Sequence, residues 1–433
     1  MRRQLITPSD AIARTTRLSR IDGMLSTMVP RIAFCYAERL DAQALALALA
    51  RVLNEYSAYA GRLCPQGAAL WLKHGVGGAA FETMASPASI DELHARASQG
   101  AMDEVCPRIS ALRASLGKEP LLAVRISQAR DGTVIGLTWH HPVGDMHSTM
   151  LLLRAWSLAY RGLPYDPPFE VPDRDAYLTE RLPDPQSAVS NAILLPASEW
   201  ITMLMRLAIQ RTRRVSFELS AKALDALTRE ASAGRSVSRN DALCAHVCSA
   251  IRQLNNQSDV STLTLTVNYR KRVGLPDSML GNALCMLPQA VERSDGLPEI
   301  AAQLRGRLDE FATKHIDYGA TLRFAQQHSS FWERTRLWMR GYEPQRGNLF
   351  VSNWTGFGIY DLTFGTGQPR YVCCLATDST WFATVHESPR TGSVAFAVTL
   401  PRALADRVNG SEGRALLYPG ASDSEYTPAA APA

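Results

Sequence analysis

A stretch rich in proline and aspartate, from Pro164 to Pro185, divides the chain into two halves that each mix helix and strand patterns. Neither the helical period nor strand alternation persists through this stretch, which is typical of a connection between domains. The 433 residues are also too many for one ordinary hydrophobic core. We therefore predict an α/β (α+β) fold of two domains, residues 1–175 and 214–433, joined by a crossover linker over residues 176–213.

Composition and charge exclude several classes of protein. The chain is 46% apolar and 20% charged, which is typical of a globular protein and not of a disordered one. Its net charge of +5 is modest for this length. The densest basic cluster is better explained as a solvated connector than as a nucleic-acid surface; it comprises Arg206, Arg211, Arg213 and Arg214. We expect a monomer without a nucleic-acid partner.

Signals for targeting, membrane insertion and metal binding are also missing from the sequence. Arg2 and Arg3 are followed by no apolar segment of the kind that a secretory signal has. No run approaches the ~18 apolar residues that a membrane span needs. The eight cysteines form no CxxC pair and no zinc-type spacing with histidine. We expect a cytoplasmic protein without membrane insertion, disulfide framework or metal.

The first half contains a strand hairpin that ends in two histidines. The segments Leu121–Ser127 and Thr133–His141 flank the turn pair Asp131-Gly132, which predicts an antiparallel pair. Alternation along the second strand places one apolar set and the last histidine on a single face, namely Ile135, Leu137, Trp139 and His141. His140 falls on the opposite face, where a structural role is favoured.

Asp145 lies four residues after His141 and just before a helical pattern that stops at Gly162. Histidine can take and return a proton near neutral pH, so the pair fits a catalytic base with a supporting carboxylate. The same residues also fit a core histidine followed by an ordinary helix N-cap. The motif alone does not separate these two interpretations.

Four further segments bear on this choice. In chain order they are Ala60-Gly61-Arg62-Leu63, Ser238–His246, Asn268–Arg272 followed by Gly281-Asn282, and Ser352–Trp354 together with Tyr360–Pro369. With Trp139–Asp145 they resemble the AGRL, HxxxD, SxxDALxAH, RxR and GN, TSW and DFGWG segments of the BAHD acyltransferases. These enzymes acylate alcohols and amines from acyl-CoA, and the resemblance spans nearly the whole chain.

The resemblance implies two chloramphenicol-acetyltransferase-like domains, each a mixed β-sheet flanked by helices, with an active-site channel between them. His141 would be the general base, and Asp145 would be structural, paired with Arg270 or, as the alternative, with Arg272. Trp354 and Ser352 would offer hydrogen bonds to the tetrahedral intermediate. Acyl-CoA would be a co-substrate, and neither a tightly bound cofactor nor an acyl-enzyme is implied.

The chain departs from the family pattern at two places. Met146 replaces the glycine usual after the motif aspartate, and Thr363 and Thr366 replace the aspartate and tryptophan of DFGWG. Two alternatives therefore stay open. One is a stand-alone condensation-type enzyme that uses a carrier-protein thioester, which the doubled His140-His141 favours. The other is a catalytically silent binding protein of the same fold.

The acceptor is not readable from the sequence. The resemblance places the loops Met24–Pro30 and Tyr318–Gln327 along the channel, and neither dictates a chemical class. Arg323 could meet an acidic acceptor, although a solvated surface charge is the simpler interpretation.

Overall fold

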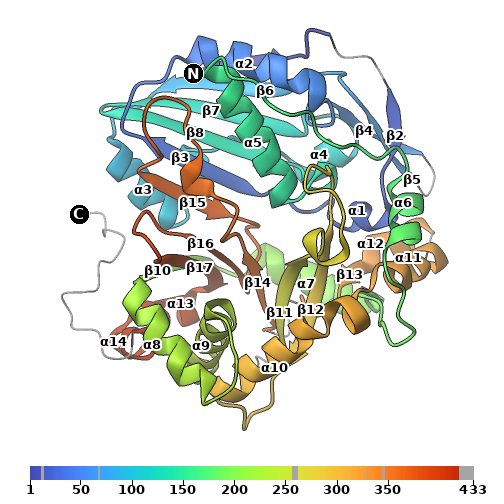
Figure 1. The fold of residues 1–433 in the computed structure, drawn as a ribbon, viewed down its shortest axis with the longest axis vertical. Helices are drawn as coiled ribbons and strands as arrows, with labels where there is room; N and C mark the ends of the chain where they lie inside the picture. Colours follow the sequence, from blue (N-terminus) through green and yellow to red (C-terminus); the bar gives the residue numbers. More distant parts are fainter. Residues whose placement is uncertain (11–13, 67–68, 256–261, 329, 344–346, 419–433) are drawn as a thin grey trace.

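The computed structural model describes residues 1–10, 14–66, 69–255, 262–328, 330–343 and 347–418. Within these residues, two six-stranded mixed sheets form the centres of the two halves, and helices cover both. Figure 1 shows the first sheet in the upper part of the view and the second below it. No helix in the described ranges is both long and apolar enough to cross a bilayer. The composition of residues 421–433, rich in Ser, Pro and Ala, predicts a frayed end, and this segment lies outside the described residues.

The first sheet has the strand order β1-β6-β7-β8-β3-β15. β6 and β7 are parallel, and the other neighbours are antiparallel. The predicted hairpin is confirmed, because β7 and β8 pair from Leu122↔Trp139 to Ala129↔Gly132. The strands are β1 (Arg2–Ile6), β3 (Arg31–Tyr36), β6 (Ala79–Ala85), β7 (Leu122–Ala129), β8 (Gly132–Trp139) and β15 (Tyr371–Leu375).

The second sheet has the order β10-β17-β16-β14-β11-β12. β14 lies parallel to both β11 and β16, so this sheet is mixed as well. The strands are β10 (Thr212–Leu219), β11 (Thr262–Asn268), β12 (Leu284–Ala290), β14 (Leu349–Asn353), β16 (Phe382–Glu387) and β17 (Val394–Pro401). Two small sheets complete the described strands: β2 (Thr15–Arg17), β5 (Ala69–Lys73) and β4 (Arg62–Gln66), and β13 (Leu337–Met339) with β9 (Ala192–Leu194).

Helices cover the sheets according to their apolar faces. α2 and α5 pack on one face of the first sheet and α3 on the other, while α8, α9 and α10 pack together over the second. The helices are α1 (Arg20–Met24), α2 (Ala42–Glu55), α3 (Ile90–Ser98), α4 (Ala111–Ser115), α5 (Met146–Tyr160), α6 (Arg174–Arg181), α7 (Ala197–Ile209), α8 (Ala221–Ser232), α9 (Arg239–Leu254), α10 (Leu297–Asp309), α11 (Tyr318–Gln327), α12 (Phe331–Arg336), α13 (Arg402–Asn409) and α14 (Ser411–Leu417).

The two halves exchange material. β15 comes from the C-terminal half, yet it pairs antiparallel with β3 and completes the first sheet, with Cys373 opposite Ala33. A division of the chain into 1–175 and 214–433 therefore does not divide the sheets, because one strand of the later segment belongs to the earlier sheet.

The region predicted as an irregular linker carries regular structure. α6 lies inside the Pro- and Asp-rich stretch, where Asp173 caps its N-terminus and Leu178 anchors it in the second core. α7 and β9 follow within residues 176–213. The stretch is therefore less irregular than its sequence indicates, because a two-turn helix with one fully buried leucine is too short to show a helical period.

Candidate active site

His141 follows β8 at the junction of the two halves. β8 ends at Trp139, and His141–Val143 form a short 3-10 turn that leads into α5. The His141 side chain is only 9% exposed. It lines a cavity, which we call the central cavity, together with residues of both halves that include Trp139, Asp145, Ser352 and Trp354.

Asn282 fixes the protonation of the His141 ring. The Nδ1 and Asn282 Oδ1 atoms lie 3.0 Å apart. The Asn282 amide nitrogen donates to Asp22 Oδ1 at 2.7 Å and to the His141 carbonyl at 3.1 Å, which sets the orientation of the amide. Because the amide oxygen only accepts, Nδ1 carries the hydrogen and Nε2 keeps its lone pair. Burial lowers the pKa of His141, and this effect outweighs the Asp145 carboxylate, which favours the charged ring. The imidazole is therefore neutral at pH 7.

Asp22 and Arg174 extend this network. Asp22 lies in α1, accepts from Ser19 N at 3.0 Å and pairs with Arg174 Nη1 at 2.5 Å. Burial raises the pKa of Asp22 to about 6, and the Arg174 charge opposes the rise. Gly281 leaves room for the arginine: its φ is +109°, and a Cβ there would meet Arg174 Cζ at 2.3 Å.

Asp145 belongs to a second, closed network. Its oxygens accept from Arg270 Nη1 at 2.7 Å, Arg270 Nη2 at 3.2 Å, Ala283 N at 3.0 Å and the α5 backbone at Ser148 N, 2.9 Å. Burial alone would raise the pKa of Asp145, but Arg270 and these hydrogen bonds lower it to about 2. The carboxylate is therefore ionised, and it serves both as the N-cap of α5 and as the ion-pair partner of Arg270.

Arg270 reaches Asp145 from a turn, not from a strand. β11 ends at Asn268, whose Oδ1 accepts from Arg270 N at 3.0 Å, and a 3-10 turn follows over Lys271–Val273. Alternation along Leu263–Arg272 predicts one strand, on which Arg270 and Arg272, two residues apart, would share a face. The structure ends the strand at Asn268, so this prediction is wrong. Arg272 instead donates to the Leu308 carbonyl at 3.2 Å.

Ser352 lies in β14 and Trp354 directly follows this strand, and both line the central cavity together with His141. The Trp354 indole N–H donates to Ser352 Oγ at 2.9 Å. The indole donor is therefore occupied, and the Ser352 hydroxyl hydrogen is left to face the cavity. The resemblance predicts that both side chains donate to the intermediate. In the structure the Trp354 indole donates to Ser352 Oγ and so orients the Ser352 hydroxyl.

His140 lies outside the central cavity. It is fully buried, and its Nε2 donates to the Ser26 carbonyl at 2.8 Å. Burial lowers the pKa of His140 to about 4, so this ring is a neutral structural donor.

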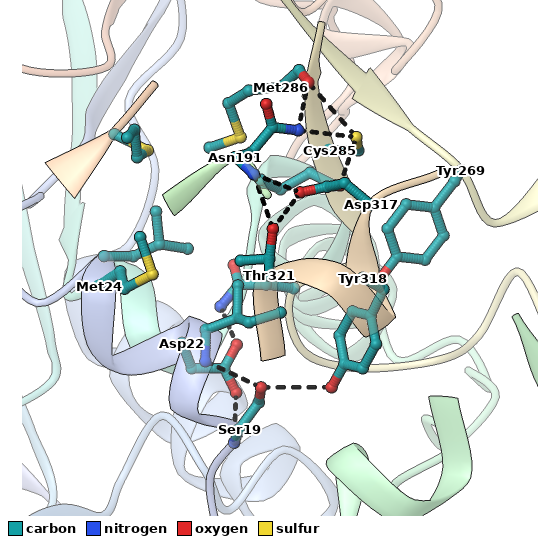
Figure 2. Close-up of a pocket in the computed structure, with 15 residues that line it drawn as sticks. Ser19, Asp22, Met24, Asn191, Tyr269, Cys285, Met286, Asp317, Tyr318 and Thr321 are labelled. Carbon is teal, nitrogen blue, oxygen red and sulfur yellow. Dashed lines mark hydrogen bonds between the residues drawn. The ribbon is translucent and has the colours of Figure 1, made fainter. Parts of the chain in front are cut away.

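Two further cavities adjoin the central one, each through a different set of shared lining residues. The basic mouth, as we call it, shares His147, Thr266, Asn268, Asn353 and Phe357 with the central cavity. Its charged lining consists of four cations, Arg154, Lys271, Arg272 and Arg305, and two carboxylates, Asp241 and Asp277. The inner cavity shares Leu25, Leu284, Met286 and Met339 with the central cavity and is lined by Asp22, Asn282 and Asp317 (Figure 2). The central cavity, which His141 lines, therefore borders both others, and we call the three together the passage. Basic side chains outnumber acidic ones in the mouth, whereas the charged residues of the inner cavity are acidic.

A model described as the Transferase family matches residues 1–407 of the chain. The chain belongs to the BAHD acyltransferase family. Vinorine synthase of Rauvolfia serpentina is 24% identical over 402 residues, covering 86% of each chain. Agmatine hydroxycinnamoyltransferase 1 of Oryza sativa subsp. japonica is 26% identical over 371 residues, covering 78% of this chain and 80% of that one.

Solved structures confirm the predicted two-domain α/β fold. The crystal structure of vinorine synthase gives a TM-score of 0.72 at 20% identity and covers 94% of this chain and 96% of that chain. F. graminearum TRI101 complexed with coenzyme A and deoxynivalenol gives 0.75 at 16% identity, covering 92% and 97%.

The remaining BAHD segments build the fold around the passage. Arg62 of AGRL donates to the carbonyls of Gly77 and Gly78. In the altered DFGWG segment, Phe364 is buried against Trp156, and the backbone N–H groups of Thr366 and Gly367 donate to Glu38. None of these residues lines the central cavity as the structure describes it. The two threonines of this BAHD member therefore alter a loop and leave the surroundings of His141 intact.

Sequence reasoning gave no role to three residues of the His141 network. Asn282 carried a signal, since it stands in the GN turn, but Asp22 and Arg174 carried none. Asp22 lies 260 positions from Asn282 and 152 from Arg174, and only the closure of the two halves brings them together. Among the described residues, no group of three His, Cys, Asp or Glu side chains could hold a metal ion.

Proposed function

We propose that this BAHD protein transfers an acyl group from an acyl-CoA thioester to a hydroxyl or amine of a small molecule, with His141 as the general base. The observation that carries the proposal is the neutral His141 ring, held by Asn282 with Nε2 free, at the central cavity, which borders both others. Both substrates bind before reaction, and no acyl-enzyme forms.

The reaction needs one base and one oxyanion donor. His141 Nε2 takes the proton of the acceptor hydroxyl or amine while its oxygen or nitrogen bonds to the thioester carbonyl carbon. The tetrahedral intermediate then collapses, the C–S bond breaks, and the imidazolium returns the proton to the departing CoA sulfur. The Ser352 hydroxyl, oriented by the Trp354 indole, donates to the oxyanion, an interaction worth about 3–4 kcal/mol in comparable sites.

The two cavities take different substrates. The basic mouth receives the phosphates of CoA, because guanidinium and ammonium groups bind phosphate through charge-assisted hydrogen bonds. Lys271 suits this role, since its side chain is 80% exposed and its pairing with Asp277, at 3.5 Å, is exposed as well. The inner cavity receives the acceptor. The TRI101 crystals, with coenzyme A and deoxynivalenol, support this division into a CoA donor and a small-molecule acceptor.

The condensation-type alternative loses the feature that favoured it. The doubled histidine is explained by the His140 hydrogen bond to Ser26, which needs no chemistry. The test is thiol release from acyl-CoA and from the matching acylated carrier protein, with a panel of alcohols and amines and with short, aromatic and long acyl groups. We expect release from acyl-CoA alone, lowered about a hundred- to ten-thousand-fold by His141→Ala. Release from the carrier only would select the condensation enzyme, and none with either thioester would select the silent binding protein.

A further inference from the structure

The inner cavity is a chamber with apolar walls and several polar lining groups, some of them in the His141 network. Its apolar walls come from Ile21, Met24, Leu25, Leu284, Met286 and Met339. The last four of these also line the central cavity, whereas Ile21 and Met24 line only the inner cavity. A molecule in the chamber therefore has a direct apolar path to His141.

The charged groups that line this chamber are all acidic. Asp22 and Asp317 line it, and among its described lining residues there is no lysine, arginine or histidine. Asp22 already has a counter-ion, since Arg174 pairs with it at 2.5 Å. Asp317 differs from Asp22 in this respect.

Asp317 is held by neutral donors alone. The residue precedes α11 and is 8% exposed. Its Oδ1 accepts from the Cys285 thiol at 2.7 Å, and its Oδ2 accepts from the Thr321 hydroxyl and from Asn191 N at 3.2 Å. Figure 2 shows these groups converging on one side of the chamber, opposite Met24. Within the described ranges, no cationic side chain forms an ion pair with Asp317.

A buried carboxylate without a counter-ion is costly, because neutral hydrogen bonds replace only part of its hydration. Burial accordingly raises the pKa of Asp317. A cation entering the chamber would recover that free energy, whereas an anionic molecule would meet two acidic groups. Arg323, which the sequence offered as a partner for an acidic acceptor, is paired with Asp184 and does not line the chamber.

We propose that the acceptor of this enzyme carries a cationic amine, an ammonium or guanidinium group, that binds Asp317 in the inner cavity while a hydroxyl or second amine of the same molecule reaches His141. This inference rests on the proposed acyl transfer and adds the chemical class of the acceptor. The cationic group stays charged and is not acylated. The reacting group loses its proton to His141.

The test compares three acceptor series of matched chain length on the full-length protein: ω-amino alcohols, n-alkanols and ω-hydroxy acids. Thiol release from acyl-CoA gives kcat/KM for each acceptor, and mass spectrometry identifies the acylated product. We expect kcat/KM for the best ω-amino alcohol to exceed that of its n-alkanol by at least about tenfold, the equivalent of 1.4 kcal/mol. The ω-hydroxy acids should be the poorest series.

Two variants locate the effect. Asp317→Asn removes the charge but keeps an oxygen that accepts from Thr321 and Asn191. It should lower kcat/KM about tenfold for amino alcohols and leave n-alkanols unchanged. Asp184→Asn is the matched control, since it removes a carboxylate that pairs with α11 through Arg323 outside the chamber. It should change neither series.

Equal or better turnover of n-alkanols by the wild-type enzyme overturns the inference and leaves the acyl transfer standing. An equal loss in both series on Asp317→Asn also overturns it, because a merely structural aspartate would behave in this way. If Asp317→Asn does not fold, the wild-type ratio of kcat/KM between the ω-amino alcohol and its n-alkanol decides. Absence of thiol release with every acceptor and thioester, including the general panel, refutes the proposed function itself.

Discussion

His141 and Asp145 stand four residues apart, yet they belong to networks of opposite character. Asp145 and Arg270 form a closed unit in which nearly every polar atom meets another inside the protein, and Arg270 is fully buried. The His141 network runs through Asn282 to Asp22 and leaves one atom, Nε2, without a partner at the cavity. A closed network stabilises a fold, whereas an open one can exchange a proton.

In the mechanism that we propose, this short motif therefore joins a general base, His141, to a residue that stabilises the fold, Asp145. Asp145 caps α5 and ties the start of that helix to the Gly281 turn through Arg270 and Ser148. His141 lies on the turn that this anchor fixes. Substitutions on the two sides should therefore separate loss of turnover from loss of folding.

The largest effect on turnover is expected for His141→Ala. Removing the general base should lower kcat about a hundred- to ten-thousand-fold, because positioned proton transfer contributes that much to rate. The melting temperature should change little, since the imidazole makes one side-chain hydrogen bond. Steady-state thiol release together with thermal unfolding measures both.

His140→Ala is the control for that substitution. It removes the neighbouring imidazole, which lies outside the central cavity. That ring donates a hydrogen bond to the Ser26 carbonyl and makes a longer contact, 3.5 Å, with Ser115 Oγ. Stability should fall and kcat per folded molecule should stay near the wild-type value. The reverse pattern, an inactive His140 variant and an active His141 variant, would exchange the roles that we assign.

Asp145→Ala should have the largest effect on stability. It leaves the Arg270 guanidinium buried without its counter-ion, which costs about 3–5 kcal/mol in buried pairs. Chemical denaturation measures the loss. Replacing Arg270 by methionine in the same chain should restore part of it, because both charges are then gone. A well-folded, inactive Asp145→Ala enzyme with unchanged unfolding would place Asp145 in the chemistry instead.

Asn282→Ala should have an intermediate effect on turnover. The imidazole would lose the acceptor that selects its Nδ1–H tautomer, and a lost buried partner costs about 1–3 kcal/mol. We expect kcat to fall by about tenfold to a hundredfold with KM for acyl-CoA unchanged, measured at saturating acceptor. An effect confined to KM would remove Asn282 from the positioning of His141.

Local patterns explain what could be predicted from the sequence. The β7–β8 hairpin follows from a turn pair between two alternating segments, and the cap at Asp145 follows from its place before an apolar helix. A local interaction also explains why the predicted strand continues past the observed end of β11 at Asn268. The residues up to Arg272 keep a strand-like alternation, but the Asn268 side chain captures Arg270 N and ends the strand.

Contacts between the halves explain what could not be predicted. Asp22 stands in a five-residue helix with no chemical signature, and only the closed fold brings its carboxylate to Asn282 and Arg174. β15 likewise has a pattern that would fit either sheet, and the choice of β3 as its partner is made in three dimensions. The acidic character of the inner cavity arises in the same way, from residues on separate elements.

The smallest expected effect is a shift in pH dependence. Burial lowers the pKa of His141, so the base stays neutral as the pH falls through 6.5, and the acid limb of kcat/KM should lie below that value. The sign for stability agrees: the unfolded chain takes up a proton at His141 before the folded one, so this group makes stability fall as the pH drops below about 6.5. Buffer-matched profiles of thiol release measure the limb.

Asp22→Asn separates the two groups that titrate in this range. Burial raises the pKa of Asp22 to about 6, so its protonation would disturb Asn282 near that pH. If the limb belongs to His141, the variant keeps it, whereas Asn282→Asp moves it to higher pH, because a carboxylate beside Nδ1 favours the imidazolium. A wild-type acid limb at or above pH 6.5 that neither substitution moves would show that His141 is not the general base. The His141 network would then be no better supported as the site of proton transfer than the Asp145 network.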